Sequence, residues 1–538
     1  MNLHLTAKRR RTLLFWLAVG WFVLAMAGAL YYIWGPMRID FNSDYSDTLM
    51  WAQAAYDSGR LIDPAFNYAT FMPFGGQLLM LPFIPLTGVS VTTHCIGMAL
   101  FALLFAGGLL FLLRSIPWDW AESLAAAGGV MALLLIGGKL REMFYGHIIY
   151  YSLGLLFLFL VSGLLLRAFR ADGEREGAKP KKRMLLYGLM FLLTALAATD
   201  GIMTIALCVI PCIGAIVLER LFDKSARRFF DRELFLSVGC LVLAAGVGLV
   251  IGKLLTGGMT AQYTEDRSGL CDSSLWGENA GKLFSYWMLQ FDALKKGSTA
   301  FMSYGGMLSA LRLVLGLALL ILPVLNLVFY RYVKTRGERL LIWAHWVLAA
   351  VIVFAHVFGE LASNHWRLVS VVCSAMLNSL IFARCAIRYG SVIWKRLGAA
   401  AAAVLAMGML LSFENLARMP RDYRNEAQLY RLSAHLEERG LTEGYGQFWF
   451  AQGLTVASGE AVKSRCVLFY GGNCSPEYYQ GREAWYSAMP DRDRYFLISY
   501  TDLYEQALEA GNPVAAEAVE AEPFEDLTIL ILDHKLFQ

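Results

Sequence analysis

The stretch FNSDYSDTLMWAQAAYDSGRLIDPAFNY, residues 41–68, follows the first long apolar run of the chain. It carries four aspartates, and two of them, Asp44 and Asp47, lie three residues apart. Carboxylates so close to an apolar run are costly unless water, a partner or a substrate stabilises them. Apolar residues recur at helical spacing after Asp47, which predicts a short amphipathic helix with Asp47 at its N-cap or in its first turn.

Asp47 can be interpreted in two ways at this point. Capping by aspartate is common, so Asp47 can be only a helix cap while Asp44 is a solvated loop acid. Alternatively, the two carboxylates form part of a functional site. The rest of the chain favours the second interpretation.

The composition identifies the broad class of the protein. Its 538 residues are 57% hydrophobic and only 17% charged, and the apolar residues fall in runs long enough to cross a bilayer, which predicts a polytopic membrane protein. No basic patch interleaved with aromatic residues suggests nucleic acid as a partner. The nine cysteines show no metal-binding spacing, and the ATP-binding, zinc-hydrolase and serine-hydrolase motifs are missing from the sequence.

Long apolar runs occupy the first three quarters of the chain. Residues 13–34 follow a basic cluster and are too long for a typical signal peptide, so we expect an uncleaved anchor. In all we expect about eleven spans of about 20 residues each. The others cover residues 88–113, 121–138, 148–169, 184–199, 202–221, 234–255, 307–330, 340–359, 367–388 and 393–413. Residues 69–86 are apolar but broken by prolines, which predicts a half-buried, interfacial or re-entrant segment.

Lysine and arginine gather in every second loop between these runs. These basic loops cover residues 8–11, 179–183, 220–232, 331–339 and 384–396. The positive-inside rule places such loops in the cytoplasm. We therefore expect a multi-pass protein of the cytoplasmic membrane with its N-terminus inside and its C-terminal part outside.

Polar side chains then fall at the outer ends of several spans. A channel is expected to place them along a path through the midplane instead. A cation at Arg367 opposes the positive-inside trend, so a phosphate partner explains it better than simple snorkelling. The outer residues that we single out are Asp44, Asp47, Arg141, Glu142, His365 and Arg367.

The composition becomes that of a soluble domain from about residue 414, and we expect a small extracytoplasmic α/β domain there. Residues 422–439 predict a helix that ends at Gly440. Short strands are predicted at residues 447–450, 454–457, 467–470, 495–499 and 527–532. Cys466 and Cys474 lie in this domain. They can form a disulfide or stay as two free thiols, and their spacing alone does not decide between the two.

Acids on one side of an outer site and cations on the other suit sugar transfer from a lipid-linked phosphate donor. A carboxylate takes the proton from an acceptor hydroxyl. Cationic side chains hold the phosphate leaving group and stabilise its developing charge. No nucleotide is needed, since the donor arrives by diffusion in the membrane.

The chain resembles the GT-C-type integral membrane glycosyltransferases, which use polyprenyl-phosphate-linked sugars. Asp47 with Trp51, Ala55 and Gly59 is similar to the acid–aromatic–Ala–Gly rhythm of their first outer loop. Thr48 stands where many members have a second acid, so Asp44 is expected to supply the pair.

Three further segments carry the resemblance. Arg141 and Glu142 match the polar second outer loop of the family. The sequence NHWR at residues 364–367 is similar to the place where members hold the donor phosphate. Residues 436–465 resemble the outer domain of a bacterial subset.

The resemblance implies an inverting glycosyltransferase. Its mainly α transmembrane bundle is expected in residues 1–413, with outer loops at 35–87 and 256–305, and its outer domain in residues 414–538. It implies Asp47 as the base, Asp44 as partner acid or metal ligand and Glu142 as a second acid. Arg141, His365 and Arg367 are then the phosphate binders. No cofactor is required, although Asp44 and Asp47 offer oxygen ligands to a divalent metal.

Two other classes of function stay open on the sequence. A transporter or flippase for lipid-linked glycans is expected to carry charges inside its spans, and Lys253 is a weak candidate. A non-catalytic envelope scaffold would not need the acids of the first outer loop. The sequence does not identify the sugar or the oligomeric state. It also does not say whether the acceptor is a lipid, a wall polymer or a protein.

Overall fold

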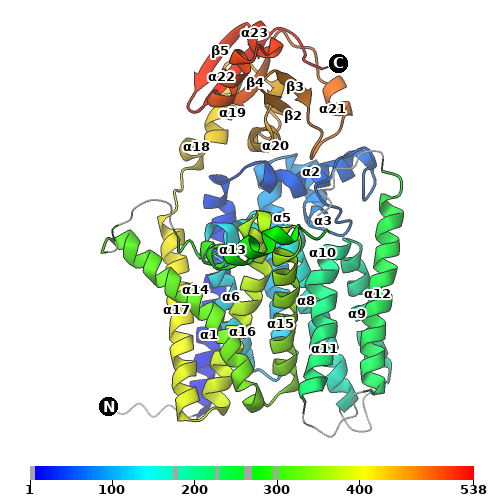
Figure 1. Ribbon diagram of the computed structural model, residues 1–538, viewed down its shortest axis with the longest axis vertical. Coiled ribbons are helices and arrows are strands. Elements are labelled where there is room, and N and C mark those ends of the chain that lie inside the picture. The colour runs from blue at the N-terminus through cyan, green and yellow to red at the C-terminus, as the bar shows by residue number, and fades with distance from the viewer. Residues whose placement is uncertain are drawn as a thin grey trace.

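The structure is a computed structural model that describes residues 7–173, 180–223, 230–259, 269–294, 300 and 302–537. Figure 1 shows long helices packed side by side in a bundle, with a small sheet domain at one end. The expected outer loop at residues 256–305 falls partly outside these residues. A helical membrane bundle with a C-terminal α/β domain is therefore confirmed as the fold class.

Helices long and apolar enough to cross a membrane make up most of the bundle. Within the described ranges there are nine of them. They are α1 (Ala7–Trp34), α5 (Val91–Leu113), α8 (Tyr150–Gly173), α10 to α11 (Ile202–Thr204, the π-helix η4 at Ile205–Val209, and Ile210–Phe222), α12 (Arg232–Thr256), α14 (Tyr304–Phe329), α15 (Arg336–Val357), η8 with α16 (His365–Leu368 and Val369–Tyr389) and α17 (Val392–Arg418).

Two of the eleven expected spans are not among these nine helices. The segment at 121–138 is split into α6 (Trp120–Leu133) and a pair formed by α7 (Gly138–Arg141) and the π-helix η3 (Glu142–Gly146), with a bend of 116° between them. At the break, a Cβ on Gly137 would lie 1.9 Å from the carbonyl oxygen of Gln290, so only glycine fits there. The other segment is α9 (Pro180–Ala198), whose basic first turn shortens its apolar part.

Shorter helices lie between the long ones. Residues 77–87 form an apolar run too short to cross a bilayer, as expected. It consists of α3 (Gln77–Met80), η2 (Leu81–Phe83) and α4 (Ile84–Thr87). The remaining short helices are η1 (Pro36–Arg38), η5 (Ser273–Leu275), α13 (Trp276–Leu289), η6 (Tyr330–Tyr332) and η7 (Leu361–Ser363).

The helix expected after the first apolar run, α2, runs from Ser43 to Ser58 and starts earlier than expected. Its N-cap is Asn42, whose side chain accepts hydrogen bonds from the backbone N–H groups of Asp44 at 3.0 Å and Tyr45 at 3.4 Å. Asp47 therefore lies beyond the first turn and is not a cap. The expectation was wrong because an asparagine caps a helix as well as an aspartate does.

Removing this cap gives a first testable prediction. The Asn42→Ala variant is expected to be less stable by about 1 kcal/mol, because two backbone N–H groups lose their partner. The measurement is thermal unfolding of the purified protein in detergent, with Asn42→Asp as the control that keeps a capping oxygen. An unchanged unfolding temperature would mean that the packing of α2 against its neighbours sets the start of the helix.

The C-terminal domain contains a six-stranded sheet in the order β3-β2-β1-β4-β6-β5. Its strands are β1 (Glu443–Gly446), β2 (Lys463–Tyr470), β3 (Asn473–Pro476), β4 (Tyr495–Tyr500), β5 (Glu520–Phe524) and β6 (Leu527–Leu532). β1 runs parallel to β2 and β4, and the other pairs are antiparallel. Its helices are α18 (Tyr423–Glu426), α19 (Gln428–Glu438), α20 (Phe448–Ala457), α21 (Ala484–Ser487), α22 (Thr501–Glu509) and α23 (Pro513–Glu517).

Two of the five expected strands are wrong. Residues 447–450 and 454–457 belong mostly to α20, which links β1 to the parallel β2. Short apolar runs do not distinguish a buried helix from a strand by periodicity, whereas a parallel pair requires a crossover, which is usually a helix. The strands expected at 467–470, 495–499 and 527–532 are confirmed.

Cys466 and Cys474 are both free thiols. Cys474 is opposite Phe469 in the antiparallel pair of β2 and β3, so Cys466 lies three residues away along the strand. At about 3.3 Å per residue this offset is roughly 10 Å, which is too long for a disulfide.

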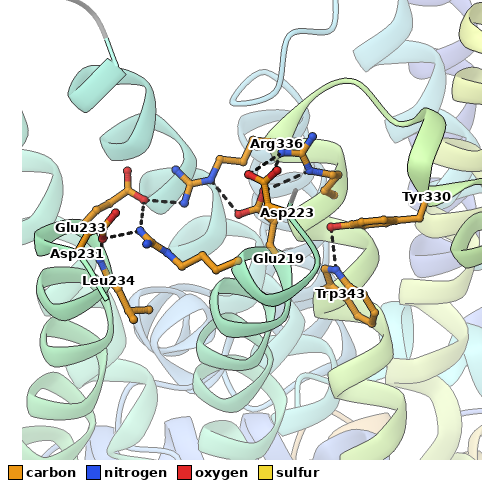
Figure 2. A network of polar contacts seen from close by, with 10 residues as sticks. Glu219, Asp223, Asp231, Glu233, Leu234, Tyr330, Arg336 and Trp343 are labelled. Atoms are coloured by element: carbon orange, nitrogen blue, oxygen red, sulfur yellow. Dashed lines mark hydrogen bonds and ion pairs between the residues drawn. The ribbon is translucent and has the colours of Figure 1, made fainter. Parts of the chain in front are cut away.

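Buried ion pairs join the helices at the end of the bundle away from the sheet (Figures 1 and 2). Glu219 of α11 is 1% exposed and pairs with Arg336 at 3.2 Å and Arg339 at 2.9 Å. Arg336 also pairs with Glu233 of α12 at 2.6 Å. Because these charges compensate one another, the network fixes the relative positions of α11, α12 and α15.

Candidate functional site

A cavity of about 1170 Å³ lies between α2, the bundle and the C-terminal domain. Its polar wall carries four of the six residues singled out in the sequence, namely Asp44, Asp47, Glu142 and Arg367. Two π-helical turns, η3 and η4, contribute to its lining. Such turns are rare and often occur at functional sites.

The two aspartates of α2 lie on one face of the helix, because they are three residues apart. Asp47 is only 6% exposed, and burial together with the charge of Asp44 raises its pKa well above the usual value. Burial also raises the pKa of Asp44 to about 6, helped by the charge of Glu142. A carboxylate with a raised pKa is a stronger base, when ionised, than an ordinary aspartate.

Glu142 opens η3 and is paired. Lys139, one turn earlier, contacts both of its carboxylate oxygens at 2.6 Å. The Lys139 ammonium also lies 4.7 Å from the centre of the Trp366 ring. Lys139 was not among the expected site residues, although its spacing of three from Glu142 is a signal for such a pair.

Arg367 reaches the cavity from η8, at the start of the α16 span. It is 4% exposed, so its guanidinium is buried in the protein and does not snorkel into solvent. Its guanidinium donates to the hydroxyl of Tyr150 at 2.5 Å and to that of Tyr151 at 2.7 Å. Neither tyrosine could be predicted as a partner of Arg367 from the sequence, because only the fold brings the start of α8 beside residue 367.

Arg141 and His365 are not among the residues that line the cavity. In the described structure, Arg141 is buried, donates to the carbonyl oxygen of Leu135 at 2.8 Å and lies 5.7 Å from the centre of the Tyr32 ring. The ring of His365 lies against Trp366, and its carbonyl oxygen accepts a hydrogen bond from Gln290 at 2.7 Å. The geometry therefore suits both residues to supporting the walls of the cavity.

The other half of the cavity is apolar and belongs to membrane-spanning helices. Aliphatic and aromatic side chains line it, so this wall suits a hydrocarbon chain better than a polar substrate. These side chains are Ile202, Met203, Ala206, Leu207 and Ile210 on the α10 to α11 span, and Ala350, Val351, Ile352, Phe354 and Ala355 on α15.

The C-terminal domain covers the cavity through the segment between β3 and α21. Tyr479 of this segment lines the cavity. The next residue, Gln480, accepts a hydrogen bond from the indole N–H of Trp51 at 2.6 Å. Arg482 forms an ion pair with Asp63, which follows α2, at 2.5 Å. The backbone of Asn67 exchanges hydrogen bonds with Gln480 and Gly481, each at 2.9 Å.

The aspartate pair offers hard oxygen ligands to a divalent cation. However, among the described residues no group of three or more histidine, cysteine or acidic side chains is placed to hold a metal ion.

The sequence matches one family model over part of its length. Residues 79–276 match the model of a family described as a family of unknown function (DUF6541). No curated protein matches the chain.

Solved structures are more informative. The crystal structure of ArnT from Cupriavidus metallidurans bound to undecaprenyl phosphate superposes with a TM-score of 0.54 at 13% identity, over 95% of this chain and 98% of that one. The apo form of the same protein gives a TM-score of 0.54 at 14% identity, over 96% of this chain and 98% of that one. The expected GT-C-type fold is therefore confirmed.

Proposed function

We propose that this membrane protein transfers a sugar from a polyprenyl-phosphate-linked donor to an acceptor hydroxyl at the outer face of the cytoplasmic membrane. The observation that carries the proposal is the composition of one cavity. It combines three carboxylates and a buried arginine with an apolar wall on two membrane-spanning stretches. The similar fold of ArnT, whose structure holds undecaprenyl phosphate, supports a lipid phosphate as the partner of the arginine.

In this proposal Asp47 is the base. The acceptor oxygen attacks the anomeric carbon of the donor sugar, and its proton passes to Asp47. The bond between that carbon and the phosphate oxygen breaks, and the lipid phosphate leaves with the electron pair. A single displacement of this kind inverts the configuration at the anomeric carbon. Asp44 and Glu142, which line the same cavity, are the partner acids.

Arg367 binds the donor phosphate in this proposal. Its bonds to Tyr150 and Tyr151 orient it, and a guanidinium stabilises the charge that develops on the leaving phosphate. Lys139, held by Glu142 beside the cavity, supplies a second positive charge. We assign Arg141 and His365 a supporting part in this arrangement and no direct contact with phosphate.

The orientation is a prediction of its own. The C-terminal domain is expected outside and the loop between α16 and α17 inside, because the latter is basic. A cysteine at Ala510, which is exposed on the C-terminal domain, should react with a membrane-impermeant thiol reagent in intact spheroplasts. A cysteine at the equally exposed Ser391 should react only after the membrane is opened. The reverse pattern would contradict the outer-face site.

The decisive experiment for the function uses cells that lack the protein. A polyprenyl-phosphate-linked sugar is expected to accumulate in them, and the wild-type chain should consume it in isolated membranes while the acceptor gains the sugar. Movement of the lipid across the membrane without loss of its sugar would instead favour a flippase. No change in any lipid-linked sugar would favour the scaffold.

A further inference from the structure

Gln480 occupies an unusual place in the C-terminal domain. Its backbone φ is 57°, a region that non-glycine residues rarely adopt, and its side chain is buried, with 1% of the residue exposed. Its N–H donates to the carbonyl oxygen of Asn67 at 2.9 Å. Its own carbonyl oxygen accepts from the side chain of Gln452 at 3.2 Å. The backbone is therefore held from both sides in a conformation that costs free energy.

This conformation directs the Gln480 amide toward α2. Its Oε1 accepts the hydrogen bond from Trp51, which leaves Nε2 as the free donor. Among the described residues, Nε2 of Gln480 and Oδ1 of Asp47 are both buried polar atoms without a hydrogen-bond partner. Trp51, which holds the Gln480 amide, lies four residues after Asp47 and so on the same face of α2. The Gln480 side chain lowers the pKa of Asp47 and so opposes the effect of burial. An unpaired buried donor beside an unpaired buried acceptor is costly unless the two are used together.

We propose that Gln480 is a positioning residue for Asp47: its amide, oriented by Trp51, presents an N–H group to the carboxylate and holds it in place. This inference deepens the proposed function, and it rests on that function only for the part that Asp47 plays as the base. It makes the C-terminal domain a component of the site and not a separate binding module.

The direction of the effect follows from the groups around Asp47. The carboxylate of Asp44 lies on the same helix and raises the pKa of Asp47. The other titratable or charged groups that line the cavity are Glu142, His147, Tyr150, Tyr151, Arg367 and Tyr479. Because the Gln480 amide favours the ionised form, its removal should raise the pKa of Asp47 further.

The test measures the protonation of Asp47 without any substrate. Full-length protein in lipid nanodiscs is titrated with pH, and the infrared band of the protonated carboxyl group is followed after subtraction of the Asp47→Asn spectrum. The Gln480→Met variant is expected to move the midpoint up by about one pH unit. Gln480→Glu is nearly isosteric and keeps an acceptor for Trp51, so it carries the test if the first variant does not fold. Its midpoint should move in the same direction.

The matched control is Gln447→Met. Gln447 belongs to the same domain, and its side chain donates to the carbonyl oxygen of Phe469 at 3.0 Å. Its substitution should leave the midpoint of Asp47 unchanged even where it lowers the unfolding temperature. An unmoved midpoint in the folded Gln480 variants would overturn the inference, whatever the transferase activity of the protein. Full activity of Asp47→Asn would overturn the proposed base instead, while a shifted midpoint would still support the coupling to Gln480.

Discussion

The Asp47→Asn variant is expected to transfer sugar roughly a hundredfold more slowly than the wild type, or slower still, because the amide cannot take the acceptor proton. The measurement is the transfer rate in membranes that hold the accumulated lipid-linked sugar. The matched control is Asp57→Asn on the same helix, since Asp57 is not among the residues that line the cavity. Near-normal transfer by Asp47→Asn would remove Asp47 from the chemistry.

The stability of this variant should not fall with its activity. Burial raises the pKa of Asp47 well above the usual value, so the folded protein favours the protonated form. Stability is therefore greatest below the unfolded pKa of about 4 and decreases as pH rises toward the folded value. At neutral pH the neutral asparagine avoids this cost, and Asp47→Asn should unfold at the same temperature as the wild type or a higher one. A variant that is both inactive and unstable would indicate a structural role.

The Arg367→Ala variant is expected to weaken binding of a polyprenyl phosphate by roughly 2–3 kcal/mol, the range for bonds to a charged group. This corresponds to an increase in Kd of about 30- to 150-fold. Undecaprenyl phosphate is the probe, and binding is measured by native mass spectrometry or calorimetry in nanodiscs. Arg367→Lys should rescue only in part, because an ammonium lacks the planar fork of the guanidinium.

Arg367→Ala also removes the guanidinium that donates to Tyr150 and Tyr151 and leaves these hydroxyls only their mutual hydrogen bond at 3.3 Å, so its unfolding temperature should fall. Tyr151→Phe separates this effect from the loss of charge. It removes one of the two hydroxyl partners of the arginine and keeps the cation, so it should lower stability while the Kd changes far less. Equal Kd values for Arg367→Ala and the wild type would show that the arginine only supports the fold.

Much of the fold follows from the sequence because the bilayer imposes its own length rule. Residues 88–113 and 234–255 are apolar over the thickness of the hydrocarbon core, so α5 and α12 could be placed to within a few residues. The rule fails where a helix breaks inside the protein. The close approach of Gln290 to Gly137 is a tertiary contact, and no local sequence pattern predicts it.

The site could be predicted only in part, for a similar reason. Asp44 and Asp47 are visible because acids beside an apolar run are rare. The partners of Arg367 are not visible, because Tyr150 lies 217 residues away in the sequence. Arg141 follows the same pattern of an outer cation as Arg367, yet its guanidinium contacts a carbonyl oxygen in the wall. Sequence position therefore points to segments that line the cavity, but the directions of the side chains depend on packing.

The cover of the cavity has a consequence for the biogenesis of the protein. Trp51 and Gln480 are separated by 429 residues, so the ribosome makes the two sides of this contact at very different times. At roughly 5–20 residues per second, the interval is on the order of 20–90 s. During that interval residues 41–68 lack their contacts with the C-terminal domain. A chain released early by a premature stop before residue 480 would keep all its membrane-spanning segments but lack the segment that covers the cavity.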